Sequence, residues 1–358
     1  MWSGGIDPDG ILFVRGIPQA LLSRSLALRT RSDGRLTAGR FDSRAHLIRT
    51  VRLPDNARMS VLVGDHRYAR ALDIANVIVA VVVWLLVIAG SDPTVNVTDP
   101  FAGQVVTAQD ARSYFGLNLA DLYAGRTDWN TIGAYPYSPA FAMLVYPLNL
   151  LPWTLFVAAW TALLIGAVWV LTGRELFLFG MVIGAMEIAG GNISLLLTVA
   201  IVWGFRWPWT WAFVLLTKIT PGVGLLWFVL RREWRQLAIA LGATAAVLAV
   251  SFVLTPFNWF AWIDLLLANT GKGGTWASIP IPLVVRLPIG VLLIAWGAPR
   301  NQRWVVPVGC MLALPALWYG SLSMLLGVIP LTTPEERARA WARMRAAVSA
   351  PFGRPAGA

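Results

Sequence analysis

Long apolar segments separated by short polar ones follow one another along the chain from about residue 74 onward. The clearest are residues 74–89, which are uncharged and rich in β-branched side chains, and residues 154–172 and 236–254. Helices of this length and apolarity fit the hydrocarbon core of a bilayer. The pattern therefore predicts an all-α polytopic membrane protein.

Several further apolar segments are shorter or interrupted. They are residues 139–151, 176–205, 207–230 and 281–296, and two short stretches within 305–331. The second is broken at Gly190-Gly191-Asn192 and the third at Lys218-Ile219-Thr220-Pro221. Broken helices at membrane depth occur only where protein or a wet cavity surrounds the freed backbone groups. We expect a helical bundle with roughly nine to eleven membrane segments.

Composition and charge support a membrane protein and indicate its orientation. The chain is 57% hydrophobic, with 19 Trp and a mean hydropathy of +0.64. Its net charge of +11 comes mainly from its ends, because residues 1–72 hold twelve Arg against six Asp and residues 333–358 hold five Arg against two Glu. Basic flanks stay in the cytoplasm, so both termini are predicted to be cytoplasmic. We expect membrane lipids as partners and no nucleic acid.

Three regions follow from this pattern. Residues 1–72 are interpreted as an Arg-rich cytoplasmic N-terminal extension, and an alternative start at Met59 stays open because the preceding residues show no sustained hydrophobic period. Residues 73–332 form the predicted membrane domain. Residues 333–358 are expected to form a basic cytoplasmic helix and tail.

Cysteine and histidine usage limits the chemistry. Cys310 is the single cysteine and lies in an apolar segment, so neither a disulfide framework nor a cysteine-based metal site is available. His46 and His66 both precede the first span. We therefore expect no metal site in the membrane domain, and no cofactor.

The polar loop at residues 90–137 is the most acidic part of the chain, with five Asp against two Arg. This balance, after one outward span, predicts a large extracytoplasmic loop. Within it, residues 108–125 have helical spacing and end at a glycine, which predicts a short amphipathic helix near the membrane surface.

Asp110 is the leading candidate for a general base, because group transfer to a hydroxyl needs a carboxylate that can take its proton. Asp121 lies eleven residues further on and would share the face of a helix, and Asp128 lies in a predicted turn. Both are secondary acid candidates. The alternative for Asp110 is a solvated loop acid or a helix N-cap.

Ionisable residues within spans are expensive, so each is a functional candidate. Lys218 and Arg286 could bind a phosphate, the latter with a bidentate fork. Glu187 is a third acid candidate. The alternatives are a buried pair between Glu187 and Lys218 and, for Arg286, extension of its head toward the interface.

Polar and aromatic residues on the predicted outer side are candidates for holding a sugar or the donor. They are Arg112, Tyr114, Tyr137, Asn192, Trp318 and Tyr319. Ring stacking on a sugar would use the aromatic members, although an interfacial aromatic belt explains such residues equally well.

Several short blocks of sequence stand in a recognisable order. They are Asp110-x-x-x-Tyr114, Leu122-Tyr123-Ala124-Gly125, Tyr135-Pro136-Tyr137-Ser138-Pro139 leading into Leu144-Val145-Tyr146-Pro147-Leu148, Gly191-Asn192-Ile193-Ser194-Leu195-Leu196, and Lys218-Ile219-Thr220-Pro221 followed by Arg231-Arg232-Glu233-Trp234-Arg235. In this order, residues 74–331 resemble the polyprenyl-phosphate-mannose-dependent mannosyltransferases of glycosyltransferase family 87.

The resemblance implies a GT-C class membrane glycosyltransferase whose active site faces away from the cytoplasm, here across a bacterial plasma membrane. In that class an Asp of the first outer loop is the base, which maps onto Asp110. The implied partners are a polyprenyl-phosphate sugar donor, with mannose as the expected sugar, and a glycolipid or glycan acceptor. The implied reaction is an inverting single displacement.

Two other functions remain open from the sequence. A transporter or lipid flippase would also use broken helices and intramembrane charges, although no related halves are visible. An inactive family member acting as a scaffold is the second alternative, since members often carry a His where this chain has Trp318-Tyr319-Gly320-Ser321.

Overall fold

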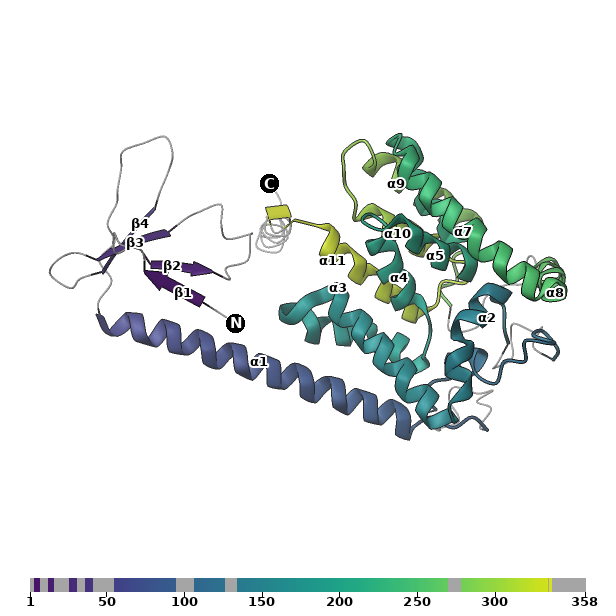
Figure 1. The fold of residues 1–358 in the computed structure, drawn as a ribbon, viewed down its shortest axis with the longest axis horizontal. Coiled ribbons are helices and arrows are strands. Elements are labelled where there is room, and N and C mark those ends of the chain that lie inside the picture. The colour runs from purple at the N-terminus through teal and green to yellow at the C-terminus, as the bar shows by residue number, and fades with distance from the viewer. Residues whose placement is uncertain are drawn as a thin grey trace, which may run out of the picture. The chain divides into compact units, whose positions relative to one another are not determined.

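The computed structural model describes residues 3–6, 12–15, 26–30, 36–40, 55–94, 106–125, 134–269, 278–333 and 335–336 (Figure 1). It divides into residues 1–71 with 338–358, and residues 72–337. In the first unit, β1 (Ser3–Ile6) pairs antiparallel with β2 (Leu12–Arg15), and β3 (Leu26–Thr30) with β4 (Leu36–Arg40). These strands are too short for their alternation to stand out in the sequence. The predicted C-terminal helix lies outside the described residues except for Glu335 and Glu336.

Helix α1 (Asp55–Ala89) contains the first apolar span. The indole of Trp84 donates a hydrogen bond to the carbonyl of Ala158 (2.8 Å), and the Asn76 amide donates to the carbonyl of Arg174 (3.0 Å). These bonds fasten the span to α3 (Trp153–Gly190). Most other large side chains of the span, such as Val77 and Leu86, are exposed, as lipid-facing positions would be.

Helix α3 is a hairpin of two helices that meet at Gly173, whose φ of 64° and ψ of −176° interrupt the helix. The rings of Trp169 and Phe177 lie 5.3 Å apart across the fold, and a Cβ added at Gly180 would lie 2.7 Å from Val168 Cγ1. Small residues allow two helix backbones to approach closely in a membrane. Two membrane segments therefore come from α3, with the break where the sequence predicted it.

The next part of the chain is the broken segment. It consists of α4 (Ser194–Trp203), η4 (Pro208–Thr210), α5 (Trp211–Thr217), η5 (Thr220–Leu225) and α6 (Leu226–Leu230). Trp211 is fully buried and fills its centre, since a Cβ at Gly224 would lie 3.0 Å from Trp211 Cζ3. The two predicted interruptions, at Gly191 and Lys218, are confirmed.

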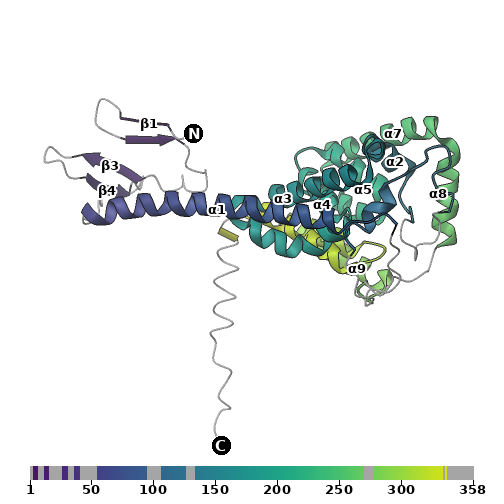
Figure 2. The ribbon, with the colours of Figure 1, turned by 90° about the horizontal axis from the view of Figure 1, so that it is seen from below.

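The remaining helices cover this centre. They are α2 (Pro139–Val145) with η3 (Tyr146–Leu150), α7 (Trp234–Leu254), α8 (Pro256–Ala268), α9 (Leu283–Gly297), α10 (Val305–Leu312), η6 (Tyr319–Gly327) and α11 (Val328–Leu331). Helices α9 and α10 cross at Gly290 and Gly309, where a Cβ on Gly290 would lie 2.8 Å from the Gly309 carbonyl. Figure 2 shows α8 turning sharply away from α7, which ends just before Pro256.

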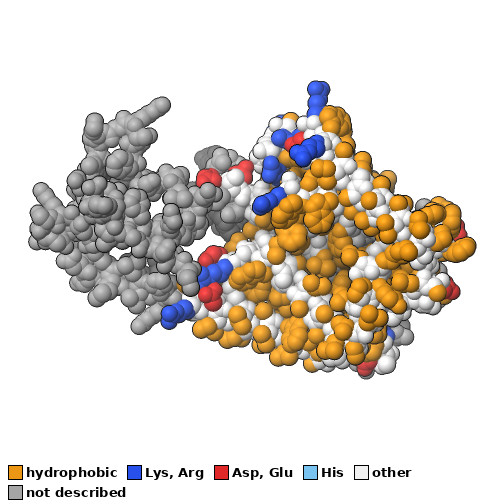
Figure 3. Space-filling view, viewed as in Figure 1, with side chains coloured by type: hydrophobic (Ala, Val, Ile, Leu, Met, Phe, Trp, Pro, Cys, Tyr) orange, Lys and Arg blue, Asp and Glu red, His pale blue; other side chains and the backbone are white. Residues whose placement is uncertain are grey.

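Three helices among the described residues are long and apolar enough to cross a membrane, namely Tyr68–Ala89, Trp153–Gly190 and Trp234–Leu254. Five shorter apolar stretches accompany them: Pro139–Leu150, Ser194–Trp203, Thr220–Leu230, Leu283–Gly297 and Tyr319–Leu331. Figure 3 shows hydrophobic side chains spread over a broad face of this unit. The chain is an integral membrane protein, and the total of nine to eleven segments stays a prediction.

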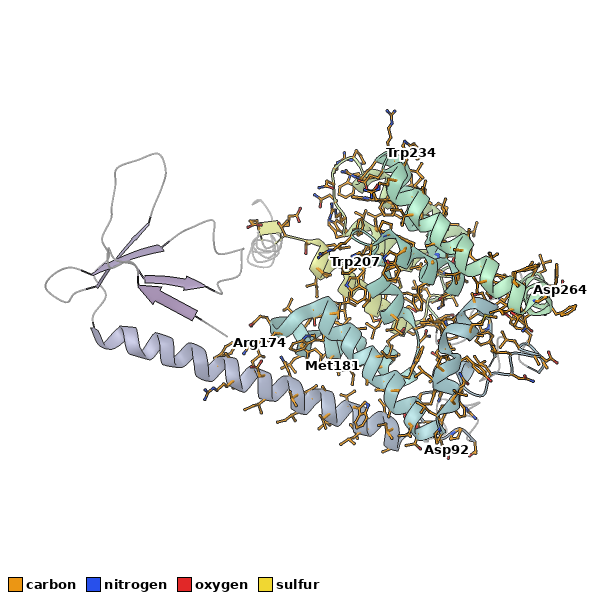
Figure 4. The ribbon with its side chains drawn as sticks, viewed as in Figure 1. Asp92, Arg174, Met181, Trp207, Trp234 and Asp264 are labelled. Atoms are coloured by element: carbon orange, nitrogen blue, oxygen red, sulfur yellow. The ribbon has the colours of Figure 1, made fainter. Side chains whose placement is uncertain are left out.

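The second unit has two chemically different ends. At one end the Arg231 guanidinium donates to the Ala298 carbonyl (2.8 Å), and Arg303 lies over the Phe205 ring (5.4 Å). The basic turns that contain Phe205, Arg231 and Arg303 therefore lie close together. Figure 4 shows Arg174 and Trp234 along this edge, with Asp92 and Asp264 along the opposite one. The predicted cytoplasmic turns therefore lie together, opposite the acidic loop.

The predicted helix over residues 108–125 is wrong. Only η2 (Asp110–Tyr114) is helical, as a short 3₁₀ turn. Gly116 takes a φ of 63°, and the side chain of Asn118 accepts a hydrogen bond from the N–H of Ala120 (3.1 Å). Asn side chains compete with helical bonds in this way and favour turns.

Helix α8 holds the outer loop in place. The Asn258 side chain accepts from the N–H of Leu122 (3.3 Å) and donates to the carbonyl of Leu119 (2.7 Å), while the Trp262 indole donates to the Pro136 carbonyl (3.1 Å). Buried backbone groups need such partners. Both flanks of the described outer loop are thus fixed against α8.

Candidate active site

The turn that carries Asp110 is packed on the end of α3. The N–H of Ala108 donates to the carbonyl of Ala189 (2.7 Å), with Ala108 at a positive φ of 57°. Gly191 ends α3 at a φ of 73°, and a Cβ there would lie 2.9 Å from Ala111 Cβ. Only glycine fits both this backbone conformation and this contact. Asp110 is therefore positioned by backbone contacts.

Asn192 orients the Asp110 carboxylate. Its Nδ2 donates to Asp110 Oδ2 (2.8 Å), and its Oδ1 accepts from the N–H of Ile193 (2.6 Å). Because the amide oxygen is committed to a backbone N–H, the amide NH₂ must point at Asp110. Asp110 Oδ1 accepts no hydrogen bond from the residues that the structure describes.

Asp110 is exposed to solvent, although protein surrounds part of its carboxyl group. Its side chain is exposed, which leaves Oδ1 reachable, yet enough protein surrounds it that desolvation raises the pKa of the carboxyl above its ordinary value. The Asn192 hydrogen bond and the nearby charge of Lys218 oppose this shift. A raised pKa makes a carboxylate a better proton acceptor.

Tyr114 and Tyr137 form the wall behind this carboxylate. Their hydroxyls lie 3.0 Å apart, and their rings meet edge to face with centroids 5.3 Å apart. Burial raises the pKa of both phenols, so both stay neutral. The Trp160 ring lies against Tyr114 (4.9 Å), and its indole donates to the Gly191 carbonyl (2.7 Å), which joins the wall to the end of α3.

Lys218 is the cation of the site. It ends α5, where the backbone turns extended, and its Nζ lies 6.0 Å from the centre of the Tyr137 ring. It interacts electrostatically with Glu187 and Asp110. Within the described part of the chain, its ammonium makes no hydrogen bond or ion pair. A half-buried ammonium beside two carboxylates is well placed to meet an anion.

Glu187 lies in the last turn of α3 with only 1% of its surface exposed. Its Oε1 accepts a hydrogen bond from the N–H of Ser194, at the start of α4. The alternative of a buried Glu187–Lys218 pair is only partly met, since the two attract each other but form no direct ion pair among the described residues. Asp110, Glu187 and Lys218 therefore lie close enough to interact electrostatically with one another.

Arg286 makes contacts different from those proposed for it. It is 3% exposed, and its guanidinium donates to four backbone carbonyls, those of Ile281, Leu312, Leu314 and Pro315, at 2.7 to 3.0 Å. It therefore neither extends to the interface nor presents its fork to a ligand. In this geometry Arg286 supports the turn after α10, and we leave it out of the donor site proposed below.

Other predicted site residues lie at its margin or beyond it. Arg112 donates to the Pro93 carbonyl and interacts with Asp92, which ties it to the loop. Asp121 is exposed and, since residues 108–125 are not a helix, the expected shared face with Asp110 is wrong. Asp128 lies outside the described residues.

Trp318 and Tyr319 enter the site only indirectly. Trp318 forms a single β-bridge with Ser278, and Tyr319 is 44% exposed. The residue that follows, Gly320, touches Glu187. Their roles in sugar stacking stay predictions.

Four residues that support the site were not among the predicted site residues, namely Ser138, Ser194, Ser321 and Trp160. The Ser138 hydroxyl donates to the carbonyl of Leu216 and so ties the outer loop to α5 just before Lys218. The Ser194 and Ser321 hydroxyls lie 3.2 Å apart between α4 and η6. Trp160 looked like any other Trp of an apolar span. Small polar residues flanking a broken helix were the available signal.

Metal ligands are not gathered in the part of the chain that the structure describes, where no group of three or more His, Cys, Asp or Glu side chains could hold an ion. The absence of a metal from the reaction stays a prediction from the sequence.

Comparison with known families matches residues 135–350 to the family described as glycosyltransferase family 87. The match covers more than half of the chain and includes Tyr137, Glu187, Asn192 and Lys218, whereas Asp110 precedes it. No curated protein and no solved structure matches the chain.

Proposed function

Because the chain belongs to glycosyltransferase family 87, we propose that it moves mannose from a polyprenyl-phosphate donor to a hydroxyl of a glycolipid or glycan acceptor. Transfer takes place on the extracytoplasmic side of a bacterial plasma membrane, with both termini in the cytoplasm. Asp110 is the general base of the reaction.

The observation that carries this proposal is the pairing of Asp110 with Asn192. The hydrogen bond occupies Oδ2 and leaves Oδ1 open, at a position reachable from outside. An oriented carboxylate with one free oxygen is what proton abstraction from an acceptor hydroxyl requires. Asp121, an exposed acid of the same loop, accepts no side-chain hydrogen bond from the residues that the structure describes.

The chemistry is a single displacement. The acceptor O–H gives its proton to Asp110 Oδ1 while its oxygen attacks the anomeric carbon. The bond from that carbon to the phosphate oxygen breaks, and its electron pair leaves with the polyprenyl phosphate. Attack opposite the leaving group inverts the anomeric centre. Lys218 stabilises the charge that grows on the phosphate, an effect that is large where water is excluded.

Membership in a glycosyltransferase family favours this function over the transporter alternative. A transporter would need the intramembrane charges to bind cargo in two alternating states. Here the Asp110 turn is fixed to α3 through Ala108 and Gly191, and the outer loop is fixed to α8. A fixed site suits chemistry at one face of the membrane.

The test is transfer in proteoliposomes that hold the full chain, labelled polyprenyl-phosphate mannose and a mixture of membrane glycolipids. We expect transfer by the wild type and a decrease of roughly 10²- to 10⁴-fold in Asp110→Asn, the usual contribution of a general base. Asp264→Asn, an exposed acid on α8, is the matched control and should keep wild-type activity.

Two outcomes would overturn the proposal. Transfer that survives Asp110→Asn would remove Asp110 as base. A folded wild type that transfers sugar from no polyprenyl-phosphate donor, whether mannose or glucose is attached, would indicate the inactive scaffold or a different donor class.

A further inference from the structure

Three turns at the basic end of the membrane unit are joined by a closed ring of contacts. The Arg303 guanidinium lies over the Phe205 ring (5.4 Å), and the Phe205 ring meets the Trp227 ring edge to face (5.6 Å). The Arg231 guanidinium lies over Trp227 (5.3 Å) and donates to the carbonyl of Ala298 (2.8 Å). Ala298 belongs to the same turn as Arg303, so the contacts return to their starting point. The three turns therefore hold one another in place.

Arg231 supports this ring rather than offering its charge to a ligand. Its Nε donates to Glu233 Oε1 (2.7 Å), and its Nη1 donates to the Ala298 carbonyl. Glu233 therefore neutralises Arg231. Glu336 lies near the same turns, with its Oε1 3.5 Å from the Gln302 amide. Neither carboxylate forms an ion pair with a second arginine among the described residues.

Arg206 and Arg303 keep charges that no carboxylate in the described part of the chain neutralises. Both are exposed, and each lies over an aromatic ring, Arg206 over Trp207 (4.9 Å) and Arg303 over Phe205. Their guanidinium groups form no hydrogen bond or ion pair with residues that the structure describes. Arg206 directly follows Phe205, so one turn holds both cations. Contact with a ring face leaves the N–H groups of a guanidinium available for bidentate bonding.

Exposed tryptophans accompany these arginines. Trp203 and Trp207 are both exposed, and their rings meet edge to face (5.8 Å). Trp296, which is also exposed, lies beneath the guanidinium of Arg300 (5.1 Å). Tryptophan is enriched where a membrane meets water. The arginines therefore lie at the depth of the lipid head groups.

We propose that this end of the membrane unit binds the phosphate of an anionic phospholipid, with Arg206 and Arg303 as its ligands. The guanidinium fork matches phosphate oxygens, and basic pockets between membrane helices bind anionic head groups. Exposed apolar side chains next to the turns, those of Val229, Leu230 and Leu292, offer a surface to the acyl chains. This favours a lipid over a phosphate ester in water.

Retention of arginines in the cytoplasm makes a different prediction. As an orientation signal, an arginine needs only its charge, so no particular arginine matters and no lipid is held. Arg235 is an example, since it is exposed and, within the described residues, lies over no ring and forms no ion pair. Arg206 and Arg303 are instead fixed by their rings, and groups fixed in advance lose less entropy on binding.

The experiment measures binding to the full chain, purified in a neutral detergent, by native mass spectrometry. The probes are phosphatidylglycerol, phosphatidylcholine and glycerol phosphate, which offer an anionic lipid, a zwitterionic lipid and a soluble phosphate ester. We expect the wild type to bind phosphatidylglycerol more tightly than the other two. Arg206→Gln/Arg303→Gln should weaken that binding by about ten- to a hundredfold, because hydrogen bonds to a charged group are lost. The control, Arg70→Gln/Arg235→Gln, removes the same charge from exposed positions and should bind as the wild type does.

Several results would overturn the inference. Equally tight binding of phosphatidylcholine would show that acyl chains and tryptophans suffice, and equally tight binding of glycerol phosphate would indicate a soluble ligand. Phosphatidylglycerol binding that survives loss of both arginines, or that falls equally in the control, would also refute it. The inference does not depend on sugar transfer, so its failure leaves the proposed function untouched.

A second variant serves if the glutamine pair does not fold. Arg206→Lys/Arg303→Lys keeps both charges and removes the planar fork. Weaker binding of phosphatidylglycerol by this variant would support the site, because an ammonium does not reproduce bidentate bonding to phosphate. Binding as tight as that of the wild type would refute it.

Discussion

Asp110 and Asn192 lie 82 residues apart in sequence and meet through one hydrogen bond of 2.8 Å. This bond opposes the desolvation that raises the Asp110 pKa, so Asn192 tunes the proposed base as well as orienting it. Because the Asn192 amide both orients the Asp110 carboxylate and lowers its pKa, substitution of Asn192 tests both effects.

Asn192→Ala should change the pH dependence of transfer. Asp110 must be ionised to accept a proton, so activity falls as the pH falls through its pKa, which lies above the ordinary value. Loss of the hydrogen bond raises that pKa further, and the acidic limb of the profile should move to higher pH. We also expect a decrease of about ten- to a hundredfold in kcat at the optimum.

The check is a pH–rate profile of kcat/KM for wild type and Asn192→Ala, with Asn118→Ala in the outer loop as control. An acidic limb that stays in place while the rate falls would show that Asn192 acts on geometry alone. A limb that moves to lower pH would contradict the role described.

Helix ends, rather than helix bodies, build this site. Asp110 lies on a 3₁₀ turn, Glu187 and Gly191 end α3, and Lys218 ends α5. The breaks at Gly191 and Lys218 follow from local sequence, because glycine permits the left-handed conformation and Pro221 cannot continue a helix. Those elements were therefore predictable.

The contacts between elements were not predictable in the same way. The guanidinium of Arg286 is chemically suited to binding a phosphate, and only the tertiary structure shows that it donates hydrogen bonds to four backbone carbonyls instead. The helical spacing of residues 108–125 was overridden by Asn118 and by Asn149, which accepts from the N–H of Leu117 (3.1 Å). Side chains that bond to backbone at a distance leave no periodic signal.

Arg286→Met should destabilise the protein without acting on the chemistry. Methionine retains the apolar length but leaves the carbonyls of the turn after α10 without a donor, at about 1–3 kcal/mol for each buried group left unpaired. We expect a large decrease in the thermal unfolding temperature in detergent, and little change in KM for the donor in the protein that remains folded.

Arg235→Met, at an exposed position in α7, is the matched control and should leave the unfolding temperature near that of the wild type. If Arg286→Met instead keeps the unfolding temperature and raises KM for the donor, Arg286 binds phosphate as first predicted.

The membrane unit as a whole has an Arg-rich end and an acid-bearing end, separated by apolar helices (Figures 3 and 4). Positive residues are generally retained in the cytoplasm, so this asymmetry predicts a side of the membrane for each turn. Cys310 is buried and gives a thiol that reagents in water do not reach, which simplifies labelling.

Single cysteines placed at each end should react from opposite sides of the membrane. Asp264→Cys on α8 should be labelled in intact cells by a membrane-impermeant maleimide, whereas Arg232→Cys, in the turn before α7, should be labelled only after the membrane is opened. The unmodified chain is the control for Cys310. Labelling of Arg232→Cys in intact cells would reverse the proposed orientation.

The fold of α3 at Gly173 also has a consequence for synthesis of the protein. Because the two halves reverse direction within a single residue, we expect them to leave the ribosome and enter the bilayer as one helical hairpin. A carboxylate such as that of Glu187 opposes insertion of a lone helix. Entering beside residues 153–172, the second half is shielded from lipid from the beginning, so the fold at Gly173 eases the chain's passage into the membrane.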